Sequence, residues 1–212
     1  MLNFKPIRKF LLWFLGIYAV LLVAGHFAGV GDAYRSLVQA MGNQVFQEWW
    51  SEGLVDFQPG NDPLQKDMDT VMLLLNRKEL GQARSGGTNV RVIKVYFSTW
   101  QSGFLSTAFI LALILASPVP NRRKAVGAGL GLLAITLFVL FRLWVNLMFS
   151  WGENPQLGVV EYSSTTSRFI AFLDGIFVKH IVVSLVVPLV LWILIAFRRE
   201  DWSRLVGSAQ ST

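Results

Sequence analysis

Four apolar stretches, each close to the length of a membrane span, constrain this chain more than any other feature of its sequence. They cover residues 10–28, 97–116, 125–149 and 176–197. A bilayer core about 30 Å thick is crossed by roughly 20 apolar residues in a helix. Hydrocarbon offers no hydrogen-bond partners, so an open-ended segment satisfies its backbone there only as an α-helix. The sequence therefore predicts an all-α membrane protein with four transmembrane helices.

The composition supports a chain that lies largely in lipid. It is 53% hydrophobic and 15% charged, whereas about 25% of the residues of a soluble domain are charged. The first apolar stretch is longer than the core of a usual signal peptide, and no convincing small-residue cleavage site follows it. An uncleaved anchor is therefore favoured over a signal peptide.

Lysine and arginine side chains set the predicted orientation. They gather in segments 1–9, 117–124 and 198–212, as Lys5, Arg8, Lys9, Arg122, Arg123, Lys124, Arg198, Arg199 and Arg204. A four-span arrangement places these segments on one side, and an excess of Lys and Arg marks the cytoplasmic side. Both termini are therefore predicted to be cytoplasmic, with segments 29–96 and 150–175 outside. The net charge of +6 then serves topology and attraction to anionic lipid, so no nucleic-acid partner is predicted.

Segment 29–96 is predicted to form a small α+β extracytoplasmic insertion between the first two spans. Apolar residues at helical spacing predict an amphipathic helix over 32–50. Two apolar, β-branched runs, 70–75 and 89–97, predict a β-hairpin or meander, with turn signals at 59–63 and 85–87. The insertion is open to two interpretations: an element that binds a partner or guides a substrate, or a lid without chemistry.

Motifs for metals and cofactors are missing from the sequence. The chain has no cysteine, and its histidines and carboxylates do not show metal-ligand spacing. The polar run 162–167 in the second outer segment has no ligand spacing either. Neither a metal nor a cofactor is therefore predicted.

The third predicted span contains three glycines at alternate positions. Gly127, Gly129 and Gly131 predict a close-packed face of this span.

Polar side chains from three of the predicted spans fall at one depth in the outer leaflet. Ionisable groups within a membrane usually face a bundle interior or a cavity. With a rise of about 1.5 Å per residue, one layer contains Gln101, Ser102, Arg142, Asn146 and His180. If their helix faces converge, the result is a basic pocket that opens to the outside. Such a pocket suits a carboxylate, a phosphate or a polar peptide segment.

Each of these residues also has a plainer interpretation. Arg142 and Lys179 can extend to the outer headgroups. Gln101 and Ser102 can cap the start of a helix, and Asn146 can join helices by hydrogen bonding. His180 can be interfacial. His26, near the outer end of the first span, and Asp174, just ahead of the last span, are further candidates, and both can be interfacial as well.

The second half of the chain, about residues 98–198, carries motifs that resemble a known family. They are Gln101-Ser102-Gly103-Phe104 at the start of an apolar span, the basic turn Asn121-Arg122-Arg123-Lys124, the pair Arg142 and Asn146 on one helix, and His180 at the start of the last span. Together they resemble the exosortase/archaeosortase family of membrane transpeptidases. The chain looks still more like the small membrane proteins that accompany some exosortases.

The resemblance implies a role in protein sorting at a bacterial inner membrane. In the family, a Cys-Ser-Gly motif, an arginine and a histidine form the site, and the cysteine attacks a sorting signal. Here Gln101 stands where the resemblance would put the cysteine, and Arg142 precedes Asn146, whereas family members usually show the asparagine first. The implied protein is a non-catalytic accessory of an exosortase-type sorting or envelope-export system that binds the sorting enzyme or its substrate.

Two alternatives remain open from the residues alone. The first is a membrane-embedded hydrolase or transpeptidase, in which Ser102 is the nucleophile, His180 the base and Arg142 the oxyanion stabiliser. The second is a structural subunit of a larger membrane complex or transporter. A transporter would normally show inverted repeats or broken helices, and Pro188 is the one predicted kink.

Overall fold

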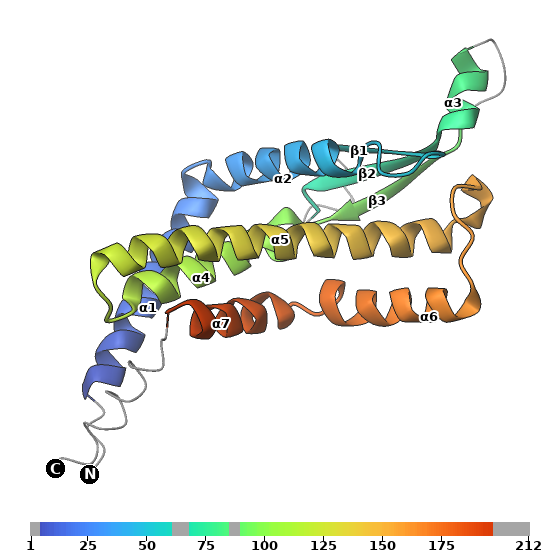
Figure 1. The fold of residues 1–212 in the computed structure, drawn as a ribbon. Coiled ribbons are helices and arrows are strands. Elements are labelled where there is room, and N and C mark those ends of the chain that lie inside the picture. The colour runs from blue at the N-terminus through green and yellow to red at the C-terminus, as the bar shows by residue number, and fades with distance from the viewer. Residues whose placement is uncertain (1–4, 61–67, 85–89, 197–212) are drawn as a thin grey trace. The chain divides into compact units, whose positions relative to one another are not determined.

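The structure is a computed structural model that describes residues 5–60, 68–84 and 90–196. It is mostly helical, with one small sheet after the first two helices (Figure 1). The chain divides into two compact units. The helical unit comprises residues 1–30, 103–138 and 182–212, and the sheet unit comprises residues 31–102 and 139–181. The predicted turn 85–87, the tail 198–212 and most of the turn 59–63 lie outside the described residues.

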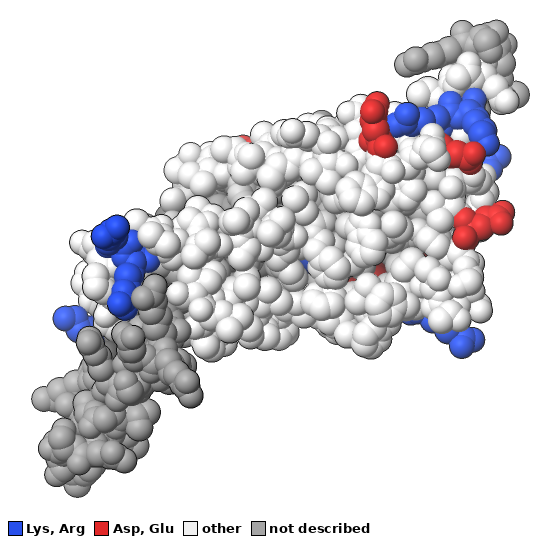
Figure 2. Space-filling view, in the orientation of Figure 1, with Lys and Arg blue, Asp and Glu red and all other residues white. Residues whose placement is uncertain are grey.

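Two described helices are long and apolar enough to cross a membrane. They are α1 (Lys5–Phe27) and α5 (Asn121–Glu153). A third candidate is a broken pair, Ser164–Val178 with Val183–Ile195. The structure therefore contains two or three candidate spans, where the sequence predicts four. Most of the surface visible in Figure 2 carries no charged side chain, as expected for a chain that contacts lipid.

The other two predicted spans are shorter or interrupted. Stretch 97–116 becomes a π-helical turn, η1 (Trp100–Phe104), followed by α4 (Leu105–Ala116). Stretch 176–197 begins in the π-helical turn η3 (Asp174–Val178), breaks, and continues as α7 (Val183–Ala196). The described part of α7 has 14 residues and covers about 21 Å.

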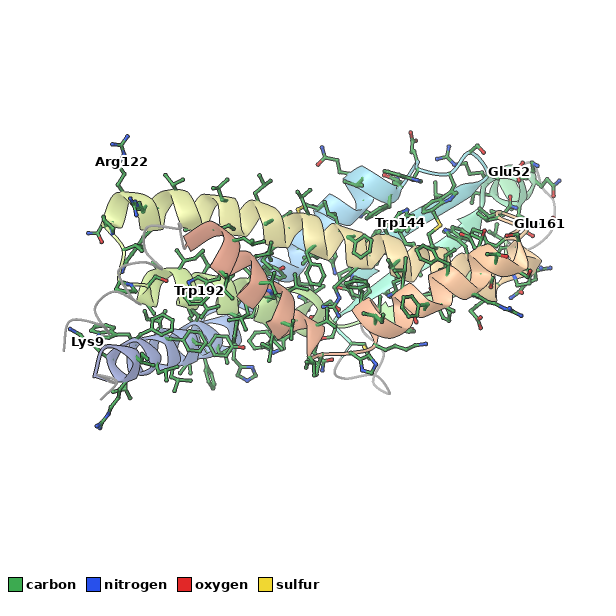
Figure 3. The ribbon with its side chains drawn as sticks, turned by 60° about the horizontal axis from the view of Figure 1, so that its bottom comes forward. Lys9, Glu52, Arg122, Trp144, Glu161 and Trp192 are labelled. Carbon is green, nitrogen blue, oxygen red and sulfur yellow. The ribbon has the colours of Figure 1, made fainter. Side chains whose placement is uncertain are left out.

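The helical unit is held together by aromatic rings and one polar contact. Phe14 lies 5.2 Å from Phe109, centroid to centroid, and Phe10 lies 5.6 Å from Trp192. Trp192 of α7 donates its indole N–H to Ser117 Oγ at 2.8 Å (Figure 3 labels this side chain). These rings enclose buried Ala112 and Leu113 of α4, so α1, α4 and α7 share one core.

Pro188 interrupts the hydrogen bonds of α7, and α4 compensates. A proline has no N–H, so the carbonyl four residues earlier, that of Ser184, loses its helical donor. Ser106 of α4 donates its hydroxyl to this Ser184 carbonyl at 2.8 Å, and both residues are fully buried. A freed backbone group in an apolar environment is costly unless a neighbour satisfies it. The serine therefore makes the proline tolerable.

The glycines of α5 separate into a packed pair and an open position. A Cβ at Gly131 would lie 2.9 Å from Ile114 Cδ1, and one at Gly127 would lie 3.5 Å from Ile114 Cγ2. A Cβ at Gly129 would meet nothing within 4 Å. The close-packed face predicted from three glycines therefore consists of Gly127 and Gly131 against α4.

A matched pair of substitutions tests this packing. Gly131→Leu is expected to destabilise the protein by roughly 1–3 kcal/mol, because the added side chain overpacks the contact with Ile114. Gly129→Leu adds the same side chain to the same helix and is expected to be neutral or slightly stabilising, since leucine is the better helix former. Thermal unfolding in detergent measures both. Equal effects would contradict the assignment of faces.

The sheet unit is built on three antiparallel strands in the order β1-β2-β3. These are β1 (Gly53–Pro59), β2 (Thr70–Asn76) and β3 (Val92–Phe97). Helix α2 (Val30–Phe46) precedes β1, and α3 (Arg77–Arg84) follows β2. The sequence predicts α2, β2 and β3 but not β1, because the apolar alternation of β1 is short.

The Asn43 side chain links α2 to β1. Asn43 Nδ2 donates to the carbonyl of Phe57 at 3.1 Å, and Asn43 Oδ1 accepts from the Phe57 N–H at 2.7 Å. The Phe57 ring packs where a Cβ at Gly42 would lie 2.9 Å from it. Glycine at position 42 therefore allows α2 to lie close against β1.

The end of α5 also packs on this unit. Trp151 is 1% exposed, and its ring centroid lies 6.1 Å from that of Trp50. Asn76 at the end of β2 donates to the Leu157 carbonyl at 2.6 Å. Leu157 belongs to the short turn η2 (Pro155–Leu157), which leads to α6 (Ser164–Leu173).

Candidate functional site

Arg142 of α5 lies at the centre of the candidate site in the sheet unit. Its side chain is buried, with 4% of the residue exposed. The guanidinium donates from Nη1 to the Ser102 carbonyl at 2.8 Å and from Nη2 to the Val178 carbonyl at 3.2 Å. One side chain thus connects α5 to η1 and η3. The arginine points into the protein and not toward lipid headgroups.

The two acceptors of Arg142 belong to π-helical turns. Such turns are rare and are frequent at functional sites. The Phe177 ring of η3 packs edge-on against the Phe141 ring of α5, with centroids 5.3 Å apart. This contact holds η3 against the same helix that carries Arg142 (Figure 3 labels the neighbouring Trp144 on α5).

A hollow of ≈ 310 Å³ opens beside the arginine. Its wall includes four of the five residues that the sequence places in one layer: Gln101, Ser102, Arg142 and Asn146. His180, the fifth, is exposed and is not among the described residues that line the hollow. The other polar side chains of the wall are those of Tyr96, Ser98, Ser150, Asp174 and Lys179.

Asp174, a further candidate from the sequence, belongs to the wall of this hollow. It is only 2% exposed, although the sequence suggests an interfacial position for it. Its Oδ2 lies 2.9 Å from Lys179 Nζ, and that ammonium also lies 4.8 Å from the centre of the Phe149 ring. Lys179 itself is 63% exposed. A carboxylate next to an apolar span normally has such a cationic partner.

Hydrogen bonds also fix the entrance to η1. Asp69 accepts from the Thr99 N–H at 2.8 Å and from its hydroxyl at 2.6 Å. Ser98 Oγ accepts from the Gln101 N–H at 3.3 Å, and the Ser98 carbonyl accepts from the Ser102 N–H at 3.0 Å. The carbonyl that Arg142 contacts is therefore held by a bonded turn.

The alternative with Ser102 as a nucleophile requires His180 nearby. His180 lies in the break between η3 and α7, not in the first turn of a helix as the sequence predicts. In the part of the chain that the structure describes, no hydrogen bond joins Ser102 Oγ to the His180 ring. Ser102 contributes its backbone carbonyl, which Arg142 contacts.

The pair Asp174–Lys179 should respond unequally to the loss of either member. Lys179→Met leaves a buried carboxylate without its cation and is expected to destabilise by roughly 2–4 kcal/mol. Asp174→Asn leaves an ammonium that water already reaches and is expected to cost about 1 kcal/mol. Unfolding in detergent at neutral pH compares the two. A larger loss for Asp174→Asn would show that the carboxylate has another stabilising role.

Comparison with known proteins identifies the family of the chain. The model of the exosortase H-associated membrane protein family matches residues 4–199. The chain belongs to this family. The resemblance to small exosortase-associated membrane proteins, which the motifs of residues 98–198 carry, is thereby confirmed and extends to the first span and the sheet unit. Neither a curated protein nor a solved structure matches the chain.

Proposed function

We propose that this member of the exosortase H-associated family is a non-catalytic accessory protein of a sorting or envelope-export system. It binds the sorting enzyme, or the tail of that enzyme's substrate, at the hollow beside Arg142. The observation that carries the proposal is the buried Arg142, which joins α5, η1 and η3 at the wall of that hollow. The family description and the missing cysteine support the accessory role.

The chemistry of the hollow indicates what it binds. Arg142 and Lys179 provide two positive charges, and Asp174 provides one negative charge. The amides of Gln101 and Asn146 add hydrogen-bonding groups that have no charge. Guanidinium and ammonium groups form their strongest hydrogen bonds with anionic oxygens. A peptide that presents a carboxylate therefore fits this wall better than an uncharged ligand.

The topology completes the proposal. All four apolar stretches contribute to the membrane-embedded part, in which α4 is a short helix of 12 residues. Both termini face the cytoplasm of a bacterial inner membrane, because the basic clusters of segments 1–9, 117–124 and 198–212 share one side. Segments 29–96 and 150–175 then lie outside, where an exosortase-type enzyme would meet a secreted substrate.

Purification from native membranes with a mild detergent tests the accessory role. The tagged full-length chain is expected to carry exosortase H with it, and deletion of its gene is expected to impair sorting. A chain that is always purified alone, in cells whose sorting survives the deletion, would overturn the proposal.

A charge variant tests whether the hollow takes part. Gln101 is exposed at the wall of the hollow, so Gln101→Glu is expected to leave the fold intact and to reduce the recovered enzyme or substrate at least threefold. Gln44→Glu makes the same change at an exposed position of α2 and is the matched control. Equal recovery with both variants would place the binding surface elsewhere.

A further inference from the structure

The two edges of the three-stranded sheet differ in their backbone hydrogen bonds. At the β1 edge, the Asn43 side chain bonds both the N–H and the carbonyl of Phe57. Two residues further, Pro59 has no N–H to present. The β1 edge is therefore closed by α2 and by a proline, both of which prevent another strand from pairing there.

The register of the sheet follows from the same contacts. In an antiparallel pair, alternate residues direct both backbone groups to the partner strand. Phe57 bonds Asn43, so it and its partner Met72 form a pair without hydrogen bonds. The bonds Gly60 N–H to Asp69 and Arg77 N–H to Glu52 have the opposite parity and agree with this assignment. Met72 must therefore direct its backbone groups to β3.

This parity determines which β3 groups face outward. Met72 is paired with Val95, so Val95 directs its N–H and carbonyl to β2, as do Ile93 and Phe97. Lys94 and Tyr96, with Val92 at the strand start, direct theirs away from the sheet. β3 pairs with β2 and is the last strand in the order of the described sheet. In this part of the chain, no hydrogen bond to the backbone of these three residues is found.

The open edge of β3 continues into the hollow beside Arg142. Val95, Tyr96 and Phe97 at the end of the strand, and Ser98 after it, all belong to the wall of that hollow. One end of an extended peptide that paired with β3 would thus lie in the hollow, near Arg142 and Lys179. The strand has six residues, a length of about 20 Å. This is enough for main-chain recognition of a short peptide.

We propose that the outer edge of β3 is a peptide-binding site, at which an extended segment with an acidic end adds as a fourth strand and places its carboxylates in the hollow. The inference rests on the proposed function and names the binding mode of that site. The occupant is a peptide because the edge offers alternating backbone donors and acceptors. We expect it to be acidic because Lys94 on the edge is positively charged. The hollow also has a net positive charge, from Arg142 and Lys179 against Asp174.

Hydrogen exchange in the full-length protein in nanodiscs gives the first test. The probe is an acetylated ten-residue peptide in which valine and threonine alternate and the last two residues are glutamate. Without peptide, the amides of Ile93 and Val95 are expected to exchange slowly and those of Lys94 and Tyr96 rapidly. With peptide, exchange at Lys94 and Tyr96 is expected to slow at least tenfold. Rapid exchange there in the presence of bound peptide would overturn the proposal.

A proline variant separates the backbone from the side chain. Lys94→Pro removes an outward N–H and leaves the bonds between β2 and β3, so the fold is retained. It is expected to weaken peptide binding at least tenfold. Lys94→Ala, which keeps the N–H, is expected to weaken binding less than threefold. The same peptide, N-methylated at alternate residues, should bind the unmodified protein at least tenfold more weakly.

The outcomes distinguish this inference from the proposed function. Equal binding by Lys94→Pro and the unmodified protein, or no binding at millimolar peptide, would overturn the strand addition, because main-chain recognition tolerates many sequences. If exosortase H is still recovered with the chain in either case, the accessory role stands without it. If peptide binds the edge but the enzyme is not recovered, the edge site stands and the enzyme-binding form of the proposed function fails.

Discussion

Arg142→Leu is expected to lower the free energy of unfolding by roughly 3–5 kcal/mol, because it removes the charged guanidinium and with it the hydrogen bonds to two partly buried carbonyls. The acceptors belong to Ser102 and Val178, so η1 and η3 both lose their connection to α5. The expected result is a lower melting temperature in detergent and faster proteolysis of the sheet unit. Recovery of exosortase H should fall with it.

Two further variants separate charge from geometry. Arg142→Lys keeps the positive charge but cannot extend a planar fork to two carbonyls, so an intermediate loss of about 2 kcal/mol is expected. Arg168→Leu removes an arginine from the exposed face of α6 and is expected to change stability by less than about 0.5 kcal/mol. Full stability of Arg142→Leu would mean that the two π-helical turns are held by other contacts.

Trp151→Ala is expected to destabilise the sheet unit by roughly 3–5 kcal/mol, the usual cost of truncating a fully buried aromatic side chain. The ring lies against Trp50, and a Cβ at Gly53 would come within 3.1 Å of its Cζ2 atom. Alanine at position 151 does not fill the space of the indole ring, so a cavity remains between the end of α5 and β1. Denaturant unfolding followed by tryptophan fluorescence measures the loss.

The indole nitrogen of Trp151 makes a second comparison possible. Within the described residues its buried N–H has no hydrogen-bond partner. Trp151→Phe therefore loses volume but no hydrogen bond and is expected to cost about 1 kcal/mol. Trp49→Ala truncates a neighbouring ring that is 57% exposed and should cost less than about 1 kcal/mol. Similar losses for Trp49→Ala and Trp151→Ala would contradict the packing described.

Hydropathy predicts which stretches of this chain are apolar enough for a membrane span but not where their helices break. Residues 176–197 are apolar enough for a span, yet the helix is interrupted after Val178. The interruption coincides with a long-range contact: the Val178 carbonyl accepts from Arg142, on another helix. A hydropathy average over a window of the sequence carries no information on contacts between residues that are far apart in the chain.

The sequence predicts those residues of the candidate site that share one depth along the predicted spans. Helical rise places Gln101, Ser102, Arg142 and Asn146 in one layer, and the structure brings them to one hollow. The sequence names Asp174 as a further candidate but suggests an interfacial position, because the residue lies just outside a predicted span; the structure buries it. The open edge of β3 requires the strand register, which depends on the contact between Asn43 and Phe57.

The hydrogen bond from Ser106 to the Ser184 carbonyl couples positions 106, 184 and 188, which are therefore expected to covary among relatives. A relative that keeps a proline at 188 is expected to keep a hydroxyl or another donor at 106, because residue 184 is fully buried and its carbonyl cannot bond the proline. A relative that loses the proline regains the ordinary helical bond, and alanine then suffices at 106. These two substitutions should therefore be found together in sequences that descend from a common ancestor.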